Sequence, residues 1–318
     1  MFRYVILVCT LAAASQSLWC QNQGNAVVMN AASFQTYMPS GGALATVFCP
    51  GAPSNLKAGL TTAPPEALPY QLAGFNVLVN SAPAPIAAVY VSPAGSSQYT
   101  QINFQVPTER NSTSGGNSSN GVLDITQSVN GSVAYACGVA GTFLGQDSGA
   151  VSGGFFADAN GYAIARHASD YSQVTTQNPA HAGETIIAYG TDFFSVWPPP
   201  PIAIPVSSQP LFQYDANLRQ FSGSWKGGGY FFLQQYPSPD GNGYSIPSTP
   251  PLVTSFLGLA PGMIGVEQIN FVVPSNQVSG DWALFYNIGT CNLNGVCESP
   301  GFFASAAYSS PYVTLPVR

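Results

Sequence analysis

Histidines and carboxylates are the first residues to weigh for chemistry, because they act as general bases, partners of nucleophiles and metal ligands. The chain has two histidines, each with a carboxylate close by in sequence: His167 with Asp170, and His181 with Glu184. Nucleophilic catalysis would also need a serine or cysteine held by such a base, and no G-x-S-x-G elbow accompanies either pair. We therefore expect surface or capping roles for both histidines.

Glycoside hydrolysis would need two facing carboxylates, and the thirteen acidic residues are scattered mostly through turns. The loops at 158–161 and 240–243 resemble calcium loops but lack the remaining acidic ligands. Turn chemistry explains both loops. The sequence thus predicts no catalytic residue, no cofactor and no bound metal, and a secreted hydrolase with an unrecognised site is the third-ranked function.

Four cysteines form an even set beyond the first twenty residues: Cys49, Cys137, Cys291 and Cys297. Cys291 and Cys297 bracket an Asn-Gly turn signal, which favours a disulfide across a hairpin. Elimination then pairs Cys49 with Cys137, both in apolar runs, as a cross-strand or inter-sheet bridge requires. Zinc is the rival use of four cysteines, but the paired C-x-x-C spacing is missing. We expect two disulfides.

An aromatic-rich stretch at 197–251 is the main candidate for ligand binding. Six of its side chains are candidates for stacking on sugar rings: Trp197, Trp225, Tyr230, Phe232, Tyr236 and Tyr244. The alternative is that residues 230–235 form a strand whose aromatic side chains lie in the core. Exposed, coplanar rings would favour a carbohydrate-binding module, whereas burial between sheets would remove that hypothesis.

Two near-copies of one heptapeptide organise the elements that carry these residues. Residues 101–107 read QINFQVP and residues 268–274 read QINFVVP, with six of seven positions identical. Apolar and polar residues alternate up to the proline, which is the pattern of a strand with one buried face. The side chains expected to point inward are Ile102, Phe104 and Val106 in the first copy, and Ile269, Phe271 and Val273 in the second.

A strand cannot bury its apolar face alone, so each copy implies a sheet around it. Short apolar runs separated by turn signals predict an all-β fold of two tandem immunoglobulin-like β-sandwich domains related by internal duplication. The predicted organisation is a signal peptide at 1–20, a first sandwich at 25–143, a bridging hairpin segment at 144–177, and a second sandwich at 178–318 with an insertion at about 197–251. The Pro- and Gly-rich residues up to Pro69 that follow Cys49 are expected to form a loop with little regular structure.

The first twenty residues read as an export signal, with Arg3 ahead of an apolar run and small residues behind it. This run is too short to span a bilayer, and no later run is long enough. A lipid anchor at Cys20 is disfavoured, because the large Trp19 precedes that cysteine. We expect a secreted, periplasmic or cell-surface protein.

The charge pattern limits the partners. The net charge is −6, and the seven basic residues are spread over the whole chain, so no basic cluster can neutralise nucleic-acid phosphates or anionic lipids. Charged residues make up 6% of the chain, against roughly 25% in ordinary soluble proteins. The polar surface is therefore rich in hydroxyls and amides, which suits an extracellular protein or a polysaccharide as partner.

Several motifs occur in a fixed order: NAASF at 30–34, the first heptapeptide, NPA at 178–180, GLAPG at 258–262, and the second heptapeptide. In these motifs, over about residues 25–318, the chain resembles an uncharacterised secreted-protein domain family described from Acidobacteria of the Solibacter type. The lobes of that family are similar to TIG/IPT immunoglobulin-like domains. It has no assigned activity, so the resemblance implies no catalytic residues. The long insertion at 197–251 departs from it.

These observations predict a secreted, non-catalytic extracellular interaction or structural module. The alternative is a carbohydrate-binding module that uses the aromatic residues of the insertion. The specific ligand and the oligomeric state stay open at this point.

Overall fold

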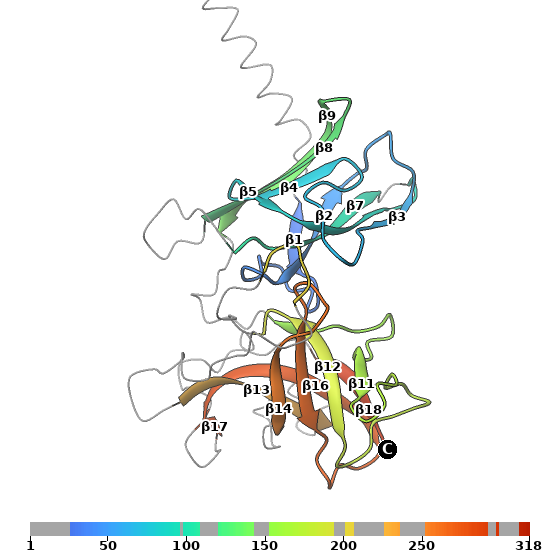
Figure 1. Cartoon of the computed structure of the whole chain (residues 1–318), viewed down its shortest axis with the longest axis vertical. Helices are drawn as coiled ribbons and strands as arrows, with labels where there is room; N and C mark the ends of the chain where they lie inside the picture. Colours follow the sequence, from blue (N-terminus) through green and yellow to red (C-terminus); the bar gives the residue numbers. More distant parts are fainter. Residues whose placement is uncertain are drawn as a thin grey trace, which may run out of the picture.

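The computed structural model describes residues 26–95, 98–108, 120–142, 153–193, 201–206, 226–235, 252–291, 297–298 and 312–318. Within these ranges every regular element is a β-strand and no helix occurs, so the predicted all-β fold is confirmed (Figure 1). All strand pairs in the sheets are antiparallel, which agrees with the alternating apolar and polar residues along the strands.

Residues 26–142 form the first lobe, a pair of facing sheets. One sheet has five strands in the order β1-β2-β7-β6-β3, and the other has four in the order β5-β4-β8-β9. The strands are β1 Val27–Asn30, β2 Leu44–Pro50, β3 Gly59–Thr62, β4 Phe75–Val79, β5 Ala82–Ala84, β6 Ile86–Val91, β7 Tyr99–Gln105, β8 Asn120–Val129 and β9 Ser132–Thr142.

The described residues from 153 onward form the second lobe, apart from the short segment 201–206 that lies between the lobes. Its larger sheet runs β10-β12-β15-β14, with β11 also paired to β12, and its smaller sheet runs β13-β16-β17, with β18 also paired to β16. The strands are β10 Gly154–Phe155, β11 Ala165–His167, β12 Thr185–Thr191, β13 Lys226–Gln235, β14 Thr254–Leu259, β15 Glu267–Val272, β16 Gly280–Cys291, β17 Cys297–Glu298 and β18 Val313–Val317.

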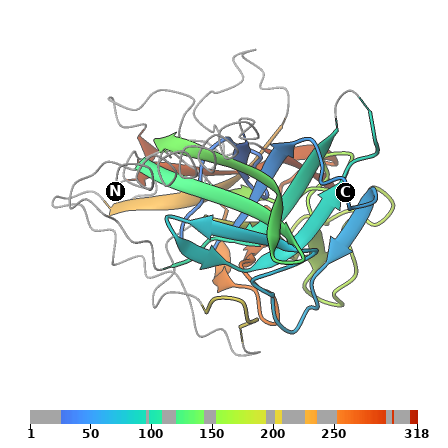
Figure 2. The same ribbon diagram turned by 90° about the horizontal axis from the view of Figure 1, so that it is seen from above.

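Each lobe is a sandwich with its own core. The inward-facing residues expected from the heptapeptides are all fully buried, which confirms that prediction: Ile102, Phe104, Val106, Ile269, Phe271 and Val273. In the first lobe they pack against Val77 and Ile125 of the opposite sheet, and in the second against Leu284 and Leu315. The two cores share no residue. Figure 1 shows the lobes stacked along the long axis, and Figure 2 looks down that axis with the first lobe in front.

The strand order is that of a constant-type immunoglobulin sandwich. In the first lobe β1-β2-β7-β6 opposes β4-β8-β9, which corresponds to the A-B-E-D and C-F-G sheets of that fold. In the second lobe β11-β12-β15-β14 opposes β13-β16-β18 in the same order. The heptapeptide occupies the E strand in both lobes, at the middle of the larger sheet.

The pairing around the two heptapeptides matches residue by residue. Phe104 stands opposite Ala45, and Phe271 stands opposite Ile186. On the other side, a β-bulge interrupts β6 between the partners of Phe104 and Asn103, and another interrupts β14 between the partners of Phe271 and Asn270. Because a one-residue slip would turn every side chain to the other face, this shared register gives both lobes the same inner and outer residues.

The turn after the first strand also matches. In the first lobe the N–H of Phe34 donates to the carbonyl of Asn30, and in the second the N–H of Tyr171 donates to the carbonyl of His167. Phe34 and Tyr171 adopt positive φ values of 54° and 60°. His167 therefore occupies the position that Asn30 has in the first lobe.

One segment differs from the expectation, and another extends the sheet of the second lobe. The stretch after Cys49 that was expected to be irregular contains β3, an edge strand that pairs with β6 and has exposed side chains. An edge strand needs no inward-facing apolar residues, so no alternation in the sequence marks it. The segment at 144–177 contributes β10 and β11, which both pair with β12 in the second lobe's larger sheet.

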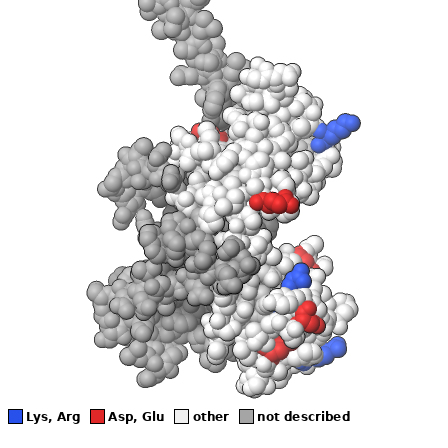
Figure 3. All heavy atoms as spheres, in the orientation of Figure 1, with Lys and Arg blue, Asp and Glu red and all other residues white. Residues whose placement is uncertain are grey.

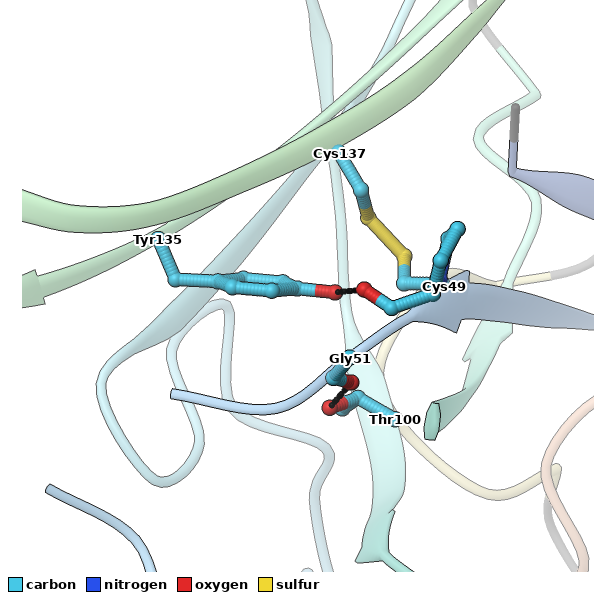
Figure 4. Close-up of a disulfide and its surroundings, with 6 residues drawn as sticks. Cys49, Gly51, Thr100, Tyr135 and Cys137 are labelled. Carbon is cyan, nitrogen blue, oxygen red and sulfur yellow. Dashed lines mark hydrogen bonds between the residues drawn. A yellow bond between two sulfur atoms is a disulfide. The ribbon is translucent and has the colours of Figure 1, made fainter. Parts of the chain in front are cut away.

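The disulfide predicted between Cys49 and Cys137 is present, with Cα atoms 5.9 Å apart. It joins β2 to β9 and so ties the two sheets of the first lobe together (Figure 4). Tyr135 lies beside it and donates its hydroxyl to the carbonyl of Pro50 at 2.8 Å. Burial raises the pKa of Tyr135 to about 12. Disulfides of this kind persist in oxidising compartments outside the cytosol.

Candidate functional site

The outward face of the first lobe's larger sheet carries a shallow hollow of about 290 Å³. Its lining residues come from three adjacent strands: Leu60 on β3, Ala88 and Tyr90 on β6, and Gln101 and Asn103 on β7. The register places Leu60 opposite Tyr90 and Tyr90 opposite Gln101, so these three side chains form one row across the sheet. Ala88 and Asn103 form the next row.

A hydrogen-bonded amide pair forms the polar side of the hollow. Gln101 Nε2 donates to Asn103 Oδ1 at 3.0 Å, and the buried Thr46 hydroxyl donates to the same oxygen at 2.9 Å. These two bonds fix the orientation of the Asn103 amide. The polar residues of the heptapeptide therefore hold each other in place on the sheet surface.

Aromatic side chains form the other side of the hollow. The ring of Tyr90 packs against that of Tyr99 with centroids 6.0 Å apart, and Tyr99 packs against Phe48 at 5.7 Å. Leu60 at the edge of the hollow is 65% exposed. The hollow thus combines amides with a braced aromatic row and contains no charged residue in its lining.

The second lobe repeats the amide pair and covers the outward face on the β12 side of it. Gln268 Nε2 donates to Asn270 Oδ1 at 2.9 Å. Their partners on β12, Tyr189 and Ile187, are buried in a separate apolar cluster on this side of the sheet. The residues that pack against this cluster come largely from the segment before and after β11: Phe156, Ile164, Ala168 and Val266.

Of the histidine and carboxylate pairs close in sequence, the structure keeps a contact between His181 and Glu184 and places His167 against Glu184 as well. His167 is 5% exposed, which contradicts a surface position, and its Nδ1 lies 3.0 Å from Glu184 Oε2. Its Nε2 lies 3.2 Å from the carbonyl of Asn178. The other oxygen of Glu184 accepts the N–H of His181, and Asp170 accepts the N–H of Ser172.

Both ring nitrogens of His167 face acceptors, so the imidazolium satisfies both while the neutral ring satisfies only one. Burial alone would lower the pKa of His167, but the bonds to Glu184 and Asn178 and the charges of Glu184 and Asp170 outweigh it and raise that pKa above its usual value. His167 ties β11 to the loop before β12. This is a structural role, close to the capping role expected from the sequence.

Buried polar side chains connect the two lobes. Gln105, the last residue of β7, receives the N–H of Ala203 at its Oε1 at 2.8 Å, and its Nε2 donates to the carbonyls of Gly42 and Pro201. Thr191 at the end of β12 accepts the N–H of Leu44 at 3.0 Å. These bonds, together with those of Asp192, define the interlobe joint.

Asp192 completes the interlobe joint. Its Oδ1 accepts the N–H of Ser40 at 3.0 Å, although its own backbone has a positive φ of 63°. Asp is one of the few non-glycine residues that adopt this region readily. The corresponding position of the first lobe is Gly51, with φ of 75°. Both lobes thus share the left-handed backbone at this position, and the second lobe uses the Asp side chain there for the interlobe contact.

Most of the sequence-predicted aromatic site lies outside the described residues: Trp197, Trp225, Tyr236 and Tyr244. Tyr230 and Phe232 lie on β13, where they stand opposite Asn287 and Phe285 of β16, and their side chains are outside the described part. The predicted strand at 230–235 is thus present. The choice between exposed and core aromatic rings in this stretch remains a prediction.

Cys291 and Cys297 stand directly opposite each other on β16 and β17. This pairing places the two backbones as a disulfide across a hairpin requires, and their side chains lie outside the described part. Within the described ranges, no group of three or more His, Cys, Asp or Glu residues is placed to hold a metal ion. Nor does any described segment form a helix long and apolar enough to cross a membrane.

The residues of the hollow were not predicted as a site from sequence. The alternating pattern does place Gln101 and Asn103 on the outward face of their strand, but it cannot show that Tyr90 and Leu60 stand beside them. Charged residues do not mark the site either, because none lines the hollow, and the charged residues that Figure 3 shows on the first lobe are few and isolated.

Comparisons with known proteins add no identification. No protein-family model matches the chain, and no curated protein matches it. One solved structure, titled "Putative membrane anchored protein from Corynebacterium diphtheriae", aligns over 92% of this chain and 59% of its own length, with 11% identity and a TM-score of 0.17. The chain therefore spans less than two thirds of that protein, and a likeness this weak carries no argument about fold or function.

Proposed function

We propose that the protein is a secreted, non-catalytic binding protein made of two immunoglobulin-like sandwiches that arose by internal duplication. The observation that carries this proposal is the contrast between the outward faces of the two larger sheets. Both have the same pairing and the same amide pair, but the first lobe has the hollow where Tyr90 and Ala88 stand opposite that pair, and the second has Gly258 and Phe256 at these positions. An open, preformed hollow on a rigid sheet is a typical place for a ligand.

Secretion is supported by the predicted signal peptide at 1–20 and by the disulfide between Cys49 and Cys137. Duplication is supported by the shared strand order, the shared bulge and the shared turn. The resemblance to secreted acidobacterial domains with TIG/IPT-like lobes agrees with both. The interlobe joint supports presentation of the first lobe's face at a fixed position on the second lobe.

The test expresses the whole chain in a bacterial host and measures its compartment, the start of the mature chain and its ability to bind extracellular polymers. We expect export, cleavage near residue 20, and retention by an insoluble polysaccharide or an immobilised cell-surface protein without release of reducing ends or peptides. Retention of the chain in the cytosol, or turnover of the polymer by purified protein, would overturn the proposal.

A further inference from the structure

We propose that the hollow on the outward face of the first lobe binds a single sugar residue of a neutral polysaccharide. This inference rests on the proposed binding function and names its ligand class and its position. The bound ring would lie against Tyr90 and Leu60, with its hydroxyl groups on Gln101 and Asn103.

The amide pair presents complementary polar atoms to such a ligand. Asn103 Oδ1 is occupied by Thr46 and Gln101, while Asn103 Nδ2 and Gln101 Oε1 make no hydrogen bond to the described part of the protein. A donor and an acceptor held side by side match two neighbouring hydroxyls of a sugar, because one hydroxyl can accept while the next donates. The existing bonds hold both amides in position before the ligand arrives, which reduces the entropy lost on binding.

The aromatic side of the hollow matches the apolar face of a sugar ring. Tyr90 presents an aromatic surface whose position is set by Tyr99 and, behind it, by Phe48. Aromatic rings offer a large contact area at low conformational cost, and the Tyr hydroxyl adds a polar group at the rim. A volume of about 290 Å³ is at the lower end of small-molecule sites, which favours one ring of a chain over a large compact ligand.

The absence of charge in the lining selects a neutral ligand. A phosphate, a uronate or an acidic peptide would lose its hydration at this surface without gaining an ionic partner from Leu60, Ala88, Tyr90, Gln101 or Asn103. The second lobe gives the matched comparison, since Gln268 and Asn270 form the same amide pair but Gly258 stands where the first lobe has Tyr90. The amide pair therefore has a structural role in both lobes, and its use in binding depends on the aromatic residue beside it.

The test is affinity electrophoresis of the mature whole chain in gels that contain one soluble polysaccharide each. Xyloglucan, galactomannan, xylan and a mixed-linkage glucan are the neutral probes, and alginate and polygalacturonate are the acidic ones. We expect retardation by at least one neutral polysaccharide. Tyr90→Ala and Asn103→Ala should each raise the dissociation constant at least about ten-fold, as the loss of a central contact does.

Two control variants separate binding from folding. Tyr90→Phe keeps the ring and should bind within about three-fold of the native chain, and Asn270→Ala removes the matched amide of the second lobe and should change nothing in the gel. Melting temperatures of all variants identify any that fail to fold.

Three outcomes would overturn the inference: no retardation by any neutral polysaccharide, retardation by the acidic ones alone, or equal binding by folded Tyr90→Ala. In the last case the proposed binding function would stand, with its site elsewhere on the chain. A native chain that binds an immobilised protein but no polysaccharide would likewise leave the proposed function intact.

Discussion

The first and second lobes place the same heptapeptide in the same strand position, yet they differ at the residues around it. The position of Cys49 in β2, opposite Thr100, corresponds to Gly190 in β12, opposite Glu267. Cys49 joins the two sheets covalently, whereas Gly190 has no room for a side chain, because an added Cβ would overlap the ring of Phe193.

An aromatic cluster takes the place of the disulfide in the second lobe. Phe193 packs against Phe155 with centroids 4.8 Å apart and against Tyr286 at 5.6 Å. Phe155 comes from the larger sheet and Tyr286 from the smaller one, so the cluster connects the two sheets by packing alone. One fold thus holds its sheets together in two ways, and only the first depends on the redox state of the compartment.

The largest effect should come from removal of the disulfide in the first lobe. The Cys49→Ala/Cys137→Ala variant opens a loop of 88 residues, for which the chain-entropy relation gives about 4.5 kcal/mol. In calorimetry we expect one transition to move to lower temperature while the other stays in place. Hydrogen exchange of the backbone amides around Tyr135 shows whether the shifted transition is that of the first lobe.

The matched variant is Cys291→Ala/Cys297→Ala. If these cysteines form the predicted hairpin disulfide, their short loop gives a smaller loss, about 2 kcal/mol, confined to the second lobe. Equal losses in both lobes from the first variant would contradict two separate cores.

The core of both lobes follows from local sequence, whereas the site does not. Alternation in the heptapeptides is enough to place Phe104 and Phe271 inside, because burial depends on a period of two along one strand. The disulfide pairing follows from counting cysteines. The hollow depends on which strands lie side by side. That arrangement is set by long-range pairing, such as that of β3 with β6, and the composition of either strand does not predict the pairing.

The interlobe joint falls on the one mismatch between the heptapeptides, which is Gln105 against Val272. Gln105 continues the alternation as an outward polar residue, so the pattern alone predicts an exposed side chain. The structure instead buries this side chain against the segment between the lobes. Its partners, Pro201 and Ala203, lie far along the chain and could not be named from the pattern.

The second largest effect should come from making the heptapeptides identical. Gln105→Val removes the hydrogen bonds that this side chain makes to the N–H of Ala203 and to the carbonyls of Gly42 and Pro201. Each buried polar group left unpaired lowers the free energy of unfolding by about 1–3 kcal/mol. We expect a total loss near 3 kcal/mol and faster proteolytic cleavage around residues 201–206. Limited proteolysis and urea denaturation measure the two effects.

The reciprocal change, Val272→Gln, is the control. Val272 is partly exposed and lies at the matching end of β15, so a polar side chain there can reach solvent. Its effect should stay within about 0.5 kcal/mol, as for a surface substitution. A similar loss from both changes would show that Gln105 matters for the sheet and not for the interlobe joint.

The smallest effect concerns the turn position that holds Asn30 in one lobe and His167 in the other. Asn30 caps its turn without a charge, by accepting the N–H groups of Ala32 and Ser33 at 2.8 and 2.9 Å. His167 uses a titratable ring between Glu184 and Asn178. The second lobe should therefore respond to pH near neutrality, and the first lobe should not.

Because the pKa of His167 is raised in the folded protein, the stabilisation from its charged form is complete below the unfolded pKa of about 6.5 and is lost as pH rises through the folded pKa. We expect the second lobe to lose at most about 1 kcal/mol on this rise, the scale of a partly exposed ion pair. Melting temperatures between pH 6 and 8.5 measure the loss.

Glu184→Gln keeps a hydrogen-bond acceptor but removes the charge, so it should flatten the pH dependence of the second lobe while leaving the first unchanged. A pH dependence that persists in Glu184→Gln, or that appears in the transition of the first lobe, would place the titrating group elsewhere.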